Sequence, residues 1–318
     1  MASYTVTDDA HWRDLRRTHV GSSDVAALFN MHAYGLTRWQ LWHIKRGTLP
    51  DAFETSVMTQ GKHFEPAIAS YAAEKYSLKL RKVRRYLEAG DCPDLGASVD
   101  YEEYGSGTLI PTELKWSLWG KEWEFDGDDL THIPDNYMLQ VQHQLAAMPS
   151  APCAQLLAFT AGDVKRMIIP RSEGIITAIK AQVSAFMASV RDNVEPPVDF
   201  AQDADAVMTM AALKPLAPMT LPPEMATLFA QFEEAKANVA AAETVRDASK
   251  AELVKYVIDN SSPASVESKA VAVCGRYKMT ISKIADTPPT VIDASMIGNT
   301  YGGRKGHARV TITTQKDK

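Results

Sequence analysis

The stretch Pro111–Lys115 (PTELK) places a carboxylate and an ammonium group two residues apart on a predicted strand, 109–115. Side chains alternate across a strand, so Glu113 and Lys115 lie on one face. Asp100 ends the strand predicted before it, 96–100, and Gly105-Ser106-Gly107 supplies the turn between the two. This hairpin would bring Asp100 beside Glu113. Two carboxylates and a lysine form a set of groups that can bind a hard cation such as Mg²⁺ and stabilise charge on phosphate.

Taken alone, the pattern D-x₁₂-E-x-K is more often surface charge on a half-exposed strand than a site. Three further blocks accompany it. Upstream, 61–66 (GKHFEP) carries Glu65 on an early helix, and downstream 137–144 (YMLQVQHQ) places Gln140 and Gln144 four residues apart on one helix face. Near the N-terminus, 15–24 (LRRTHVGSSD) joins two arginines to a Gly-Ser helix start, which is a natural phosphate site.

The fold class follows from the order of the elements. A length of 318 residues favours two modules, because single cores stop growing at about 250 residues. Strands at 84–88, 96–100, 109–115, 155–160 and 164–169 stand among helices at 22–30, 37–46, 60–76, from 135 onward and at 173–192. This alternation predicts a mixed α/β domain.

The domain organisation is read from the change of composition near residue 196. Residues 1–195 form the α/β domain, and 196–222 is a Pro-rich linker with little periodicity. Residues 223–318 form an accessory module, with a long helix over 223–259 and a β-hairpin around the Gly-rich loop 302–306.

Composition excludes several classes of protein. The net charge is −5, and residues 1–200 carry 20 basic and 26 acidic residues, a local net charge of −6. This argues against a protein that coats nucleic acid through bulk positive charge. No apolar run is long enough to span a membrane, and no signal peptide is visible. Three dispersed cysteines fit neither a disulfide framework nor a C-x-x-C site, so we expect a reducing cytoplasm.

In their order and spacing the blocks resemble the lambda-type alkaline exonuclease family, also called YqaJ-like viral recombinases, within the PD-(D/E)xK nucleases. The resemblance covers roughly residues 11–195. Thr112 precedes Glu113, so the "PD" of the name is not literal here, and the aspartate of the family motif matches Asp100. The fold that the resemblance implies is restriction-endonuclease-like, with a mixed central sheet flanked by helices.

The resemblance also implies a metal site. Glu65, Asp100 and Glu113 would ligate one or two Mg²⁺ ions together with the carbonyl group of Leu114, and Mn²⁺ is expected to substitute. Lys115 would position the attacking water. Gln140 would orient the site from its helix.

The arginine block would bind the 5′-phosphate of the substrate. Arg16 and Ser23 match the family positions for this role, while Arg17 and Ser22 are their immediate neighbours in the block. The sequence leaves open which of the two arginines contacts the phosphate.

The function implied by the resemblance is a Mg²⁺-dependent 5′→3′ exonuclease that acts on linear double-stranded DNA. It would leave 3′ single strands for a single-strand annealing protein during phage-type recombination. Members of the family form a closed ring, usually a trimer, so a homo-oligomer is expected. A phage or prophage gene product of this kind would work in the cytoplasm of a bacterial host.

Two alternatives remain open at this point. One is an endonuclease or RecB-like nuclease module; the related Cas4-type nucleases need four cysteines, which this chain lacks. The other is a non-catalytic DNA-binding scaffold for recombination. A scaffold has no need of Asp100, Glu113 and Lys115 together.

Other polar and aromatic groups have simpler explanations. Gln144 is expected on the polar face of its helix, and His63 and His143 in polar packing rather than as metal ligands. The basic cluster Lys79–Arg85 is either a solvated strand edge or a DNA track. We expect a solvated loop over Glu122–Asp129. The remaining aromatic candidates are expected in the core or at an interface, namely Trp116, Trp119 and Trp123.

Overall fold

In the computed structural model the chain forms two compact units, Met1–Ala217 and Pro218–Lys318. The structure describes residues 2–51, 55–105, 107–117, 122–213, 216–261, 270–284, 290–291, 300–301 and 307–314. Trp119 and the Gly-rich loop 302–306 lie outside the described residues.

The first unit is built around a seven-stranded sheet with the order β2-β5-β6-β9-β10-β8-β7. Its strands are β2 Leu80–Lys82, β5 Tyr101–Glu103, β6 Ile110–Trp116, β7 Glu124–Asp126, β8 Asp129–His132, β9 Cys153–Thr160 and β10 Asp163–Pro170. The pairs β6–β9 and β10–β8 are parallel and the others antiparallel, so the sheet is mixed. The tight turn from β9 to β10 uses Ala161 and Gly162, both with positive φ.

The helices of this unit are α1 Asp9–Thr18, the 3₁₀ helix η1 Val25–Phe29, α2 Arg38–Lys45, α3 Ser56–Lys75, α4 Asp135–Ala147, α5 Glu173–Arg191 and α6 Ala204–Leu213. The Thr37 hydroxyl caps α2 by accepting a hydrogen bond from Gln40 N at 3.0 Å, as the capping pattern predicts. Gly47, with φ of 70°, follows the end of the helix.

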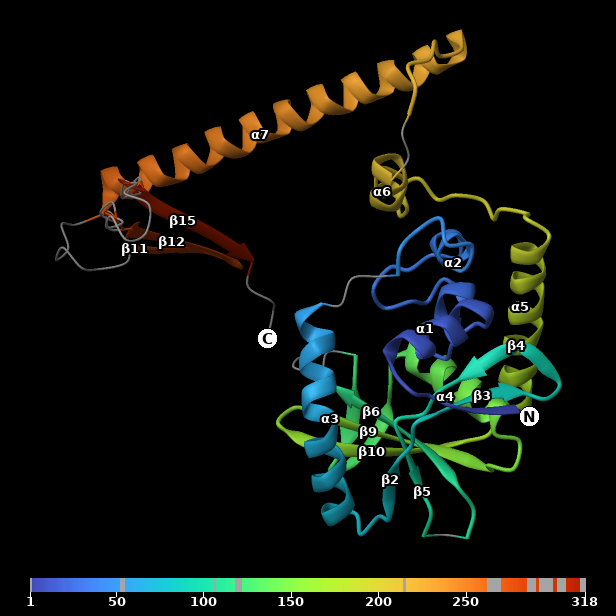
Figure 1. Ribbon diagram of the computed structural model, residues 1–318. Helices are drawn as coiled ribbons and strands as arrows, with labels where there is room; N and C mark the ends of the chain where they lie inside the picture. The colour runs from blue at the N-terminus through green and yellow to red at the C-terminus, as the bar shows by residue number, and fades with distance from the viewer. Residues whose placement is uncertain are drawn as a thin grey trace. The chain divides into compact units, whose positions relative to one another are not determined.

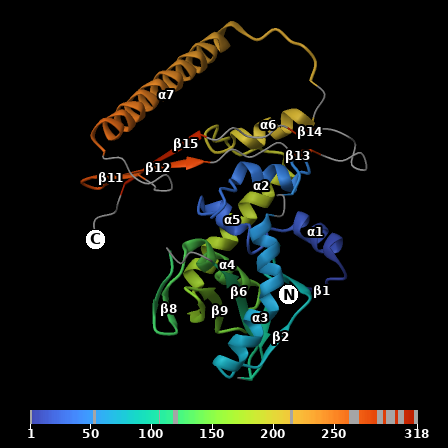
Figure 2. The same ribbon diagram turned by 90° about the vertical axis from the view of Figure 1, so that its left-hand side faces the viewer.

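The two faces of the central sheet carry different helices. Leu114 and Leu157 pack with Ile68 and other residues of α3 on one face, whereas Leu156 belongs to the larger core formed with α4 and α5. Figure 1 and, turned by 90°, Figure 2 show these helices beside the sheet. Successive strand residues therefore serve opposite layers, as the pleat requires. The predicted mixed α/β fold, with a central sheet flanked by helices, is confirmed.

A second, smaller antiparallel sheet has the order β1-β3-β4, with β1 Ala2–Thr5, β3 Arg85–Ala89 and β4 Cys92–Ala97. Both α4 and α5 contact β4. A bridge between Val20 and Leu95 joins the segment after α1 to this sheet. A side chain at Gly96 would overlap the ring of buried Tyr86, so only glycine fits there.

The structure corrects the predicted strand 96–100. Strand β4 ends at Ala97, and the chain then passes from the small sheet to the central one, where β5 begins at Tyr101. Asp100 therefore precedes a strand instead of ending one. The short β5 was not predicted, because three residues show too little alternation to be recognised.

The predicted α-helix 22–30 is also wrong. Only Val25–Phe29 is helical, as a 3₁₀ turn that ends at Asn30 in the left-handed region, with φ of 57°. The Asp24 side chain is held by Arg16 and Lys45, so it does not cap the helix. The phosphate-binding helix start expected at this place is therefore absent from the segment.

The predicted linker 196–222 contains helix α6. The buried Asp203 carboxylate just before α6 accepts hydrogen bonds from Thr37 Oγ1 at 2.6 Å and from Gln40 Nε2 at 2.9 Å. These contacts tie the residues around Asp203 to the start of α2. Periodicity alone does not reveal them.

The second unit consists of the short 3₁₀ helix η2 Pro223–Met225, the 35-residue helix α7 Ala226–Asn260 and β-structure. The long C-terminal helix was predicted over 223–259. Strands β11 Ala270–Cys274, β12 Tyr277–Ile284 and β15 His307–Thr314 form an antiparallel sheet, and β13 Thr290–Val291 pairs with β14 Thr300–Tyr301. The predicted hairpin corresponds to β12 and β15, and β11 is an addition. Within the described ranges no helix has the length and apolar character needed to cross a membrane.

The buried His143 predicts how stability depends on pH. It lies on α4 with Nε2 2.9 Å from the Gly96 carbonyl oxygen, and burial lowers its pKa to about 4. Because the unfolded chain takes up a proton near pH 6.5, stability is full above that pH. It falls by up to about 3 kcal/mol as pH drops toward 4.

We expect His143→Gln to flatten this decline, as measured by urea unfolding between pH 7 and 4.5. His63→Gln, at an exposed position on α3, serves as the control and should retain the wild-type pH dependence. An unchanged decline in His143→Gln would assign the acid sensitivity to other groups.

Candidate active site

A cavity of about 310 Å³ gathers residues from η1, α3, β6, α4 and the segment before β5. Its walls include Ser23, Tyr34, Gly61, Glu65, Asp100, Glu113, Leu114, Lys115, Trp116, Tyr137 and Gln140. Seven of the residues predicted for the site therefore face one space. Arg16, Arg17 and Ser22 do not line it.

The carboxylates of Asp100 and Glu113 are brought together by the β5–β6 pairing. Tyr101 pairs with Thr112 in the antiparallel β5–β6 ladder. Asp100, just before Tyr101, therefore lies next to Glu113, just after Thr112. The Asp100 Oδ2 atom accepts a hydrogen bond from Leu114 N at 2.9 Å. The predicted proximity is thus present, although it arises through a different strand pair from the one expected.

The Glu113 carboxylate is buried and accepts three hydrogen bonds. Lys115 Nζ and Gln140 Nε2 donate to Oε1 at 2.5 and 2.6 Å, and Gln144 Nε2 donates to Oε2 at 2.6 Å. Gln144 is 1% exposed, so the expectation that it lies on the polar surface of its helix is wrong. The i, i+4 spacing of the two glutamines was the pattern that could have identified both.

Glu65 enters the cavity from α3 and is paired with a second lysine. Lys82 Nζ lies 2.9 Å from Glu65 Oε1 and forms an ion pair with it. Sequence reasoning placed Lys82 only in a basic cluster. Nothing in the local pattern indicates its partner, because Glu65 is 17 residues away on another element.

Two carboxylates, those of Asp100 and Glu113, are buried close together in the cavity. Burial and then the Glu113 carboxylate raise the pKa of Asp100 well above its usual range; Glu65 adds to this and Lys115 opposes it. Burial lowers the pKa of Lys115, but Glu113 and Asp100 outweigh it, so the net change is upward and the ammonium form persists. Asp100 and Glu113 thus lie against the Lys115 ammonium, Lys82 pairs with Glu65, and Lys62 also lines the cavity.

The donors of the cavity are of the chemical kind that a hard divalent cation binds. The cavity offers the carboxylate oxygens of Glu65, Asp100 and Glu113, and the partner of Glu65 Oε1 is the Lys82 ammonium. Across the described ranges, no three His, Cys, Asp or Glu side chains are grouped closely enough to bind one ion directly. Lysine and glutamine donors contact the oxygens of Glu113 and Glu65 in this conformation.

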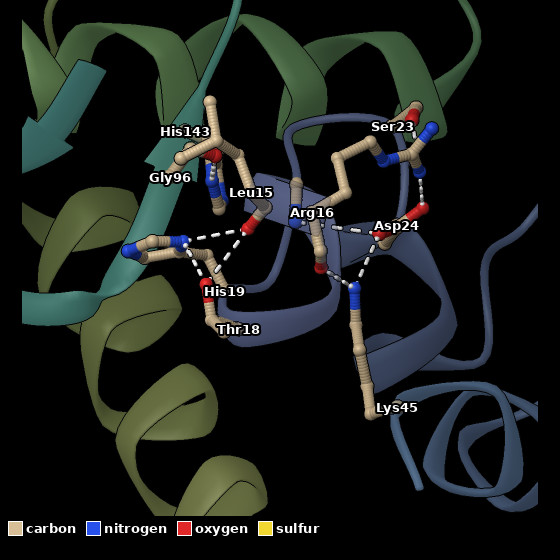
Figure 3. Close-up of polar contacts among 10 residues, drawn as sticks. Leu15, Arg16, Thr18, His19, Ser23, Asp24, Lys45, Gly96 and His143 are labelled. Carbon is tan, nitrogen blue, oxygen red and sulfur yellow. Dashed lines mark hydrogen bonds and ion pairs between the residues drawn. The ribbon is translucent and has the colours of Figure 1, made fainter. Parts of the chain in front are cut away.

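The two candidate arginines point to different partners. Arg16 Nη2 donates to Ser23 Oγ at 3.2 Å and forms an ion pair with buried Asp24 (Figure 3). Arg17 is exposed, and its Nη2 lies 3.9 Å from Asp51 Oδ2. Ser22 is buried. Of these residues only Arg16 contacts a side chain that lines the cavity, namely Ser23.

The basic cluster Lys79–Arg85 is neither a plain solvated edge nor a continuous row of free cations. Arg81 and Arg85 pair with Glu102, whose side chain is fully buried, and Lys82 pairs with Glu65. Three of the five cations thus neutralise buried or half-buried carboxylates.

The tryptophans, the histidines and the segment Glu122–Asp129 lie in different surroundings. Trp116 packs against Phe64 at the cavity wall, with ring centroids 5.4 Å apart, and Trp123 is buried. The segment Glu122–Asp129 is no simple loop, because β7 and the start of β8 form a hairpin there. His63 is exposed, whereas His143 is buried in polar packing as expected.

Comparison with known proteins gives one family and several solved structures. The family model of the YqaJ-like viral recombinase domain matches residues 11–149. No curated protein sequence matches the chain.

Two exonucleases are among the similar solved structures. The alkaline exonuclease LHK-Exo from Laribacter hongkongensis has 17% identity and a TM-score of 0.44, over 63% of this chain and 99% of that one. A phage-related exonuclease from Haemophilus somnus has 14% identity and a TM-score of 0.44, over 57% of this chain and 98% of that one.

The matched residues 11–149 include every side chain discussed for the cavity, from Ser23 to Gln144, as well as Arg16. The family match and the cavity thus fall in the same part of the first unit. Residues 11–149 of this chain are thus similar to the YqaJ-like viral recombinase domain.

Proposed function

We propose that this chain is a Mg²⁺-dependent 5′→3′ exonuclease acting on linear double-stranded DNA. The observation that carries the proposal is the convergence of Asp100, Glu113 and Lys115, with Glu65 and Gln140, on one cavity of the matched domain. An acidic, lysine-containing cavity of this kind suits hydrolysis of a phosphodiester. The 3′ single strands that result would serve phage-type recombination by strand annealing.

Glu65, Asp100, Glu113 and the carbonyl group of Leu114 would hold the metal, with Mn²⁺ as a substitute for Mg²⁺. These are the oxygen donors that hard cations prefer. When bound, such an ion supplies positive charge that stabilises the negative charge developing on the phosphate.

The chain's own residues would perform the remaining tasks. Lys115 Nζ, held by Glu113 Oε1 at 2.5 Å, would orient the attacking water and neutralise charge on the phosphate. Gln140 and Gln144 fix the Glu113 carboxylate from α4 through their amide groups. The lysine would thereby be kept at a defined place in the cavity.

The 5′-phosphate would be bound by Arg16 together with Ser23. Arg16 supports this assignment because its guanidinium reaches Ser23 at the cavity wall. Arg17 is directed toward Asp51 instead. A phosphate held by Arg16 would leave the first linkages of the same strand to enter the acidic cavity.

We extend the proposal to assembly and partners. Three copies would form a ring around duplex DNA in the bacterial cytoplasm and pass the 3′ strand to an annealing protein. Residues 223–318 would be an accessory module for assembly or partner contact. A truncation should be made after Ala217, where the compact units divide, because Asp203 contacts Thr37 and Gln40.

The test is digestion of linear duplex labelled at the 5′ or the 3′ end, beside a covalently closed circle, in Mg²⁺. We expect release of the 5′ label first and an intact circle. Cutting of the circle would favour an endonuclease. Binding without any degradation would favour a scaffold.

A further inference from the structure

A buried lysine stands behind the arginine assigned to the 5′-phosphate. Lys45 is the last residue of α2, and its side chain is 3% exposed. Its Nζ donates to Asp24 Oδ2 at 3.1 Å and to the backbone carbonyl oxygen of Arg16 at 2.6 Å (Figure 3). A lysine is rarely buried unless its charge is paired, so this position calls for an explanation.

The Arg16 guanidinium is held on three sides. Its Nη2 contacts Ser23 and Asp24, and its carbon lies 4.6 Å from the centre of the Trp12 ring. A Cβ atom at Gly21 would lie 3.2 Å from both Arg16 Nε and Asp24 Oδ2, so a residue larger than glycine would crowd the Arg16–Asp24 pair. In the described part of the chain no group bonds to Nη1, which leaves donors for an anion.

Asp24 alone would cancel the charge of Arg16. It is 5% exposed and also accepts a hydrogen bond from Gly21 N at 3.3 Å. Burial raises its pKa, but Arg16 and Lys45 outweigh burial, and the pKa of Asp24 lies far below its usual range. The carboxylate is therefore ionised, and an Arg16–Asp24 pair by itself is neutral and attracts an anion weakly.

Lys45 adds a second positive charge to the Arg16–Asp24 pair and also binds the backbone carbonyl oxygen of Arg16. Arg16, Lys45 and Asp24 together carry a net charge of +1, while the nearby Asp51 lies against Arg17. Arg16 O is in the last turn of α1, so the ammonium group caps that helix end. One side chain thus restrains both the main chain of Arg16 and the carboxylate that orients its guanidinium.

We propose that Lys45 is the positioning residue of the phosphate pocket: it anchors Arg16 and supplies the second cation that leaves the pocket positive toward a terminal phosphate. This inference rests on the proposed function, because it takes the 5′-phosphate to be the ligand of Arg16. Lys45 acts through Arg16 and Asp24 and does not itself touch the phosphate.

The test measures binding, so that it is separate from cleavage. Affinities for a short linear duplex with 5′-phosphate and with 5′-hydroxyl ends are compared in EDTA. We expect the wild type to prefer the phosphorylated duplex by about tenfold or more, and Lys45→Met to bring the ratio close to one, because one charge-assisted contact contributes about that factor.

Two further variants make the result specific. Lys45→Gln can still donate to Arg16 O but has no charge, and it replaces Lys45→Met if that variant fails to fold; it too should lose the preference. Lys75→Met is the matched control, since Lys75 also ends a helix, α3, and pairs with Asp128 and Asp163 at 2.8 and 2.7 Å. This control should unfold more readily and keep the wild-type ratio.

The proposal is overturned if folded Lys45→Met or Lys45→Gln keeps the wild-type preference, if Lys75→Met loses it equally, or if the wild type shows none. The proposed function fails differently, through absence of nuclease activity in Mg²⁺. That result leaves the binding ratio measurable.

Discussion

Replacing Lys115 with alanine should slow cleavage of linear duplex DNA by at least about a thousandfold. The Lys115 ammonium is the group nearest to Glu113 Oε1, and its pKa is raised, so it is a charged donor at neutral pH. In the proposed mechanism, its removal would leave the attacking water and the phosphate without that charge. Affinity for duplex DNA in EDTA should change by less than about threefold, because a side chain that acts mainly in the transition state adds little to ground-state binding.

Lys165→Ala is the matched control for this experiment. Lys165 is 8% exposed on β10 of the same sheet, and its Nζ donates to the Gly127 carbonyl oxygen at 2.7 Å, away from the cavity. Its loss should lower the thermal midpoint and leave cleavage by the folded protein near the wild-type rate. Equal loss of cleavage in both variants would mean that Lys115 serves the fold and not the reaction.

Asp100→Asn should abolish cleavage by about a thousandfold and, in EDTA, raise the thermal midpoint by about 2–4 °C. The activity falls because a proposed metal ligand is lost. Stability rises because Asp100 is buried beside the Glu113 carboxylate, which keeps the pKa of Asp100 high and makes its ionised form costly. The asparagine oxygen can still accept the hydrogen bond from Leu114 N.

Asp24→Asn is the comparison. Asp24 is also buried, but its neighbours are the cations Arg16 and Lys45, whereas Asp100 lies beside the Glu113 carboxylate. Asp24 lies between Arg16 and Lys45, which hold its pKa down, so its charge is stabilising. We expect the thermal midpoint to fall in Asp24→Asn and to rise in Asp100→Asn, measured by calorimetry in EDTA. A lower midpoint in both variants would contradict the inference that Asp100 is destabilised by burial beside the Glu113 carboxylate.

Much of the central fold could be predicted from local periodicity in the sequence. The period of α3, α4 and α5 and the alternation in β6, β9 and β10 are sufficient to place these elements, since each is long and buries one face. The short strand β5 was not predicted, and the 3₁₀ helix η1 was predicted as a longer α-helix, because three to five residues are too few to show a period. Asp100 could be placed beside Glu113 from the hairpin argument, but the sheet change after Ala97 could not.

The partners of buried charges were the least predictable part of the site. Lys45 pairs with Asp24, 21 residues away, and Lys82 with Glu65, and no spacing rule joins such positions. Gln144 looked like a surface residue because its helix was read without knowing which face meets β6. Such contacts are set by tertiary packing, so sequence periodicity identifies the candidates and leaves their partners open.

The most direct test of the account is release of nucleotides from a 5′-phosphorylated linear duplex by the wild-type protein in Mg²⁺ and again in EDTA. We predict progressive release in Mg²⁺, none in EDTA, and recovery when Mg²⁺ is added in excess of the chelator. Release at the same rate in EDTA would contradict a metal-dependent site at Glu65, Asp100 and Glu113. Stable binding with no release in Mg²⁺ would contradict the nuclease itself.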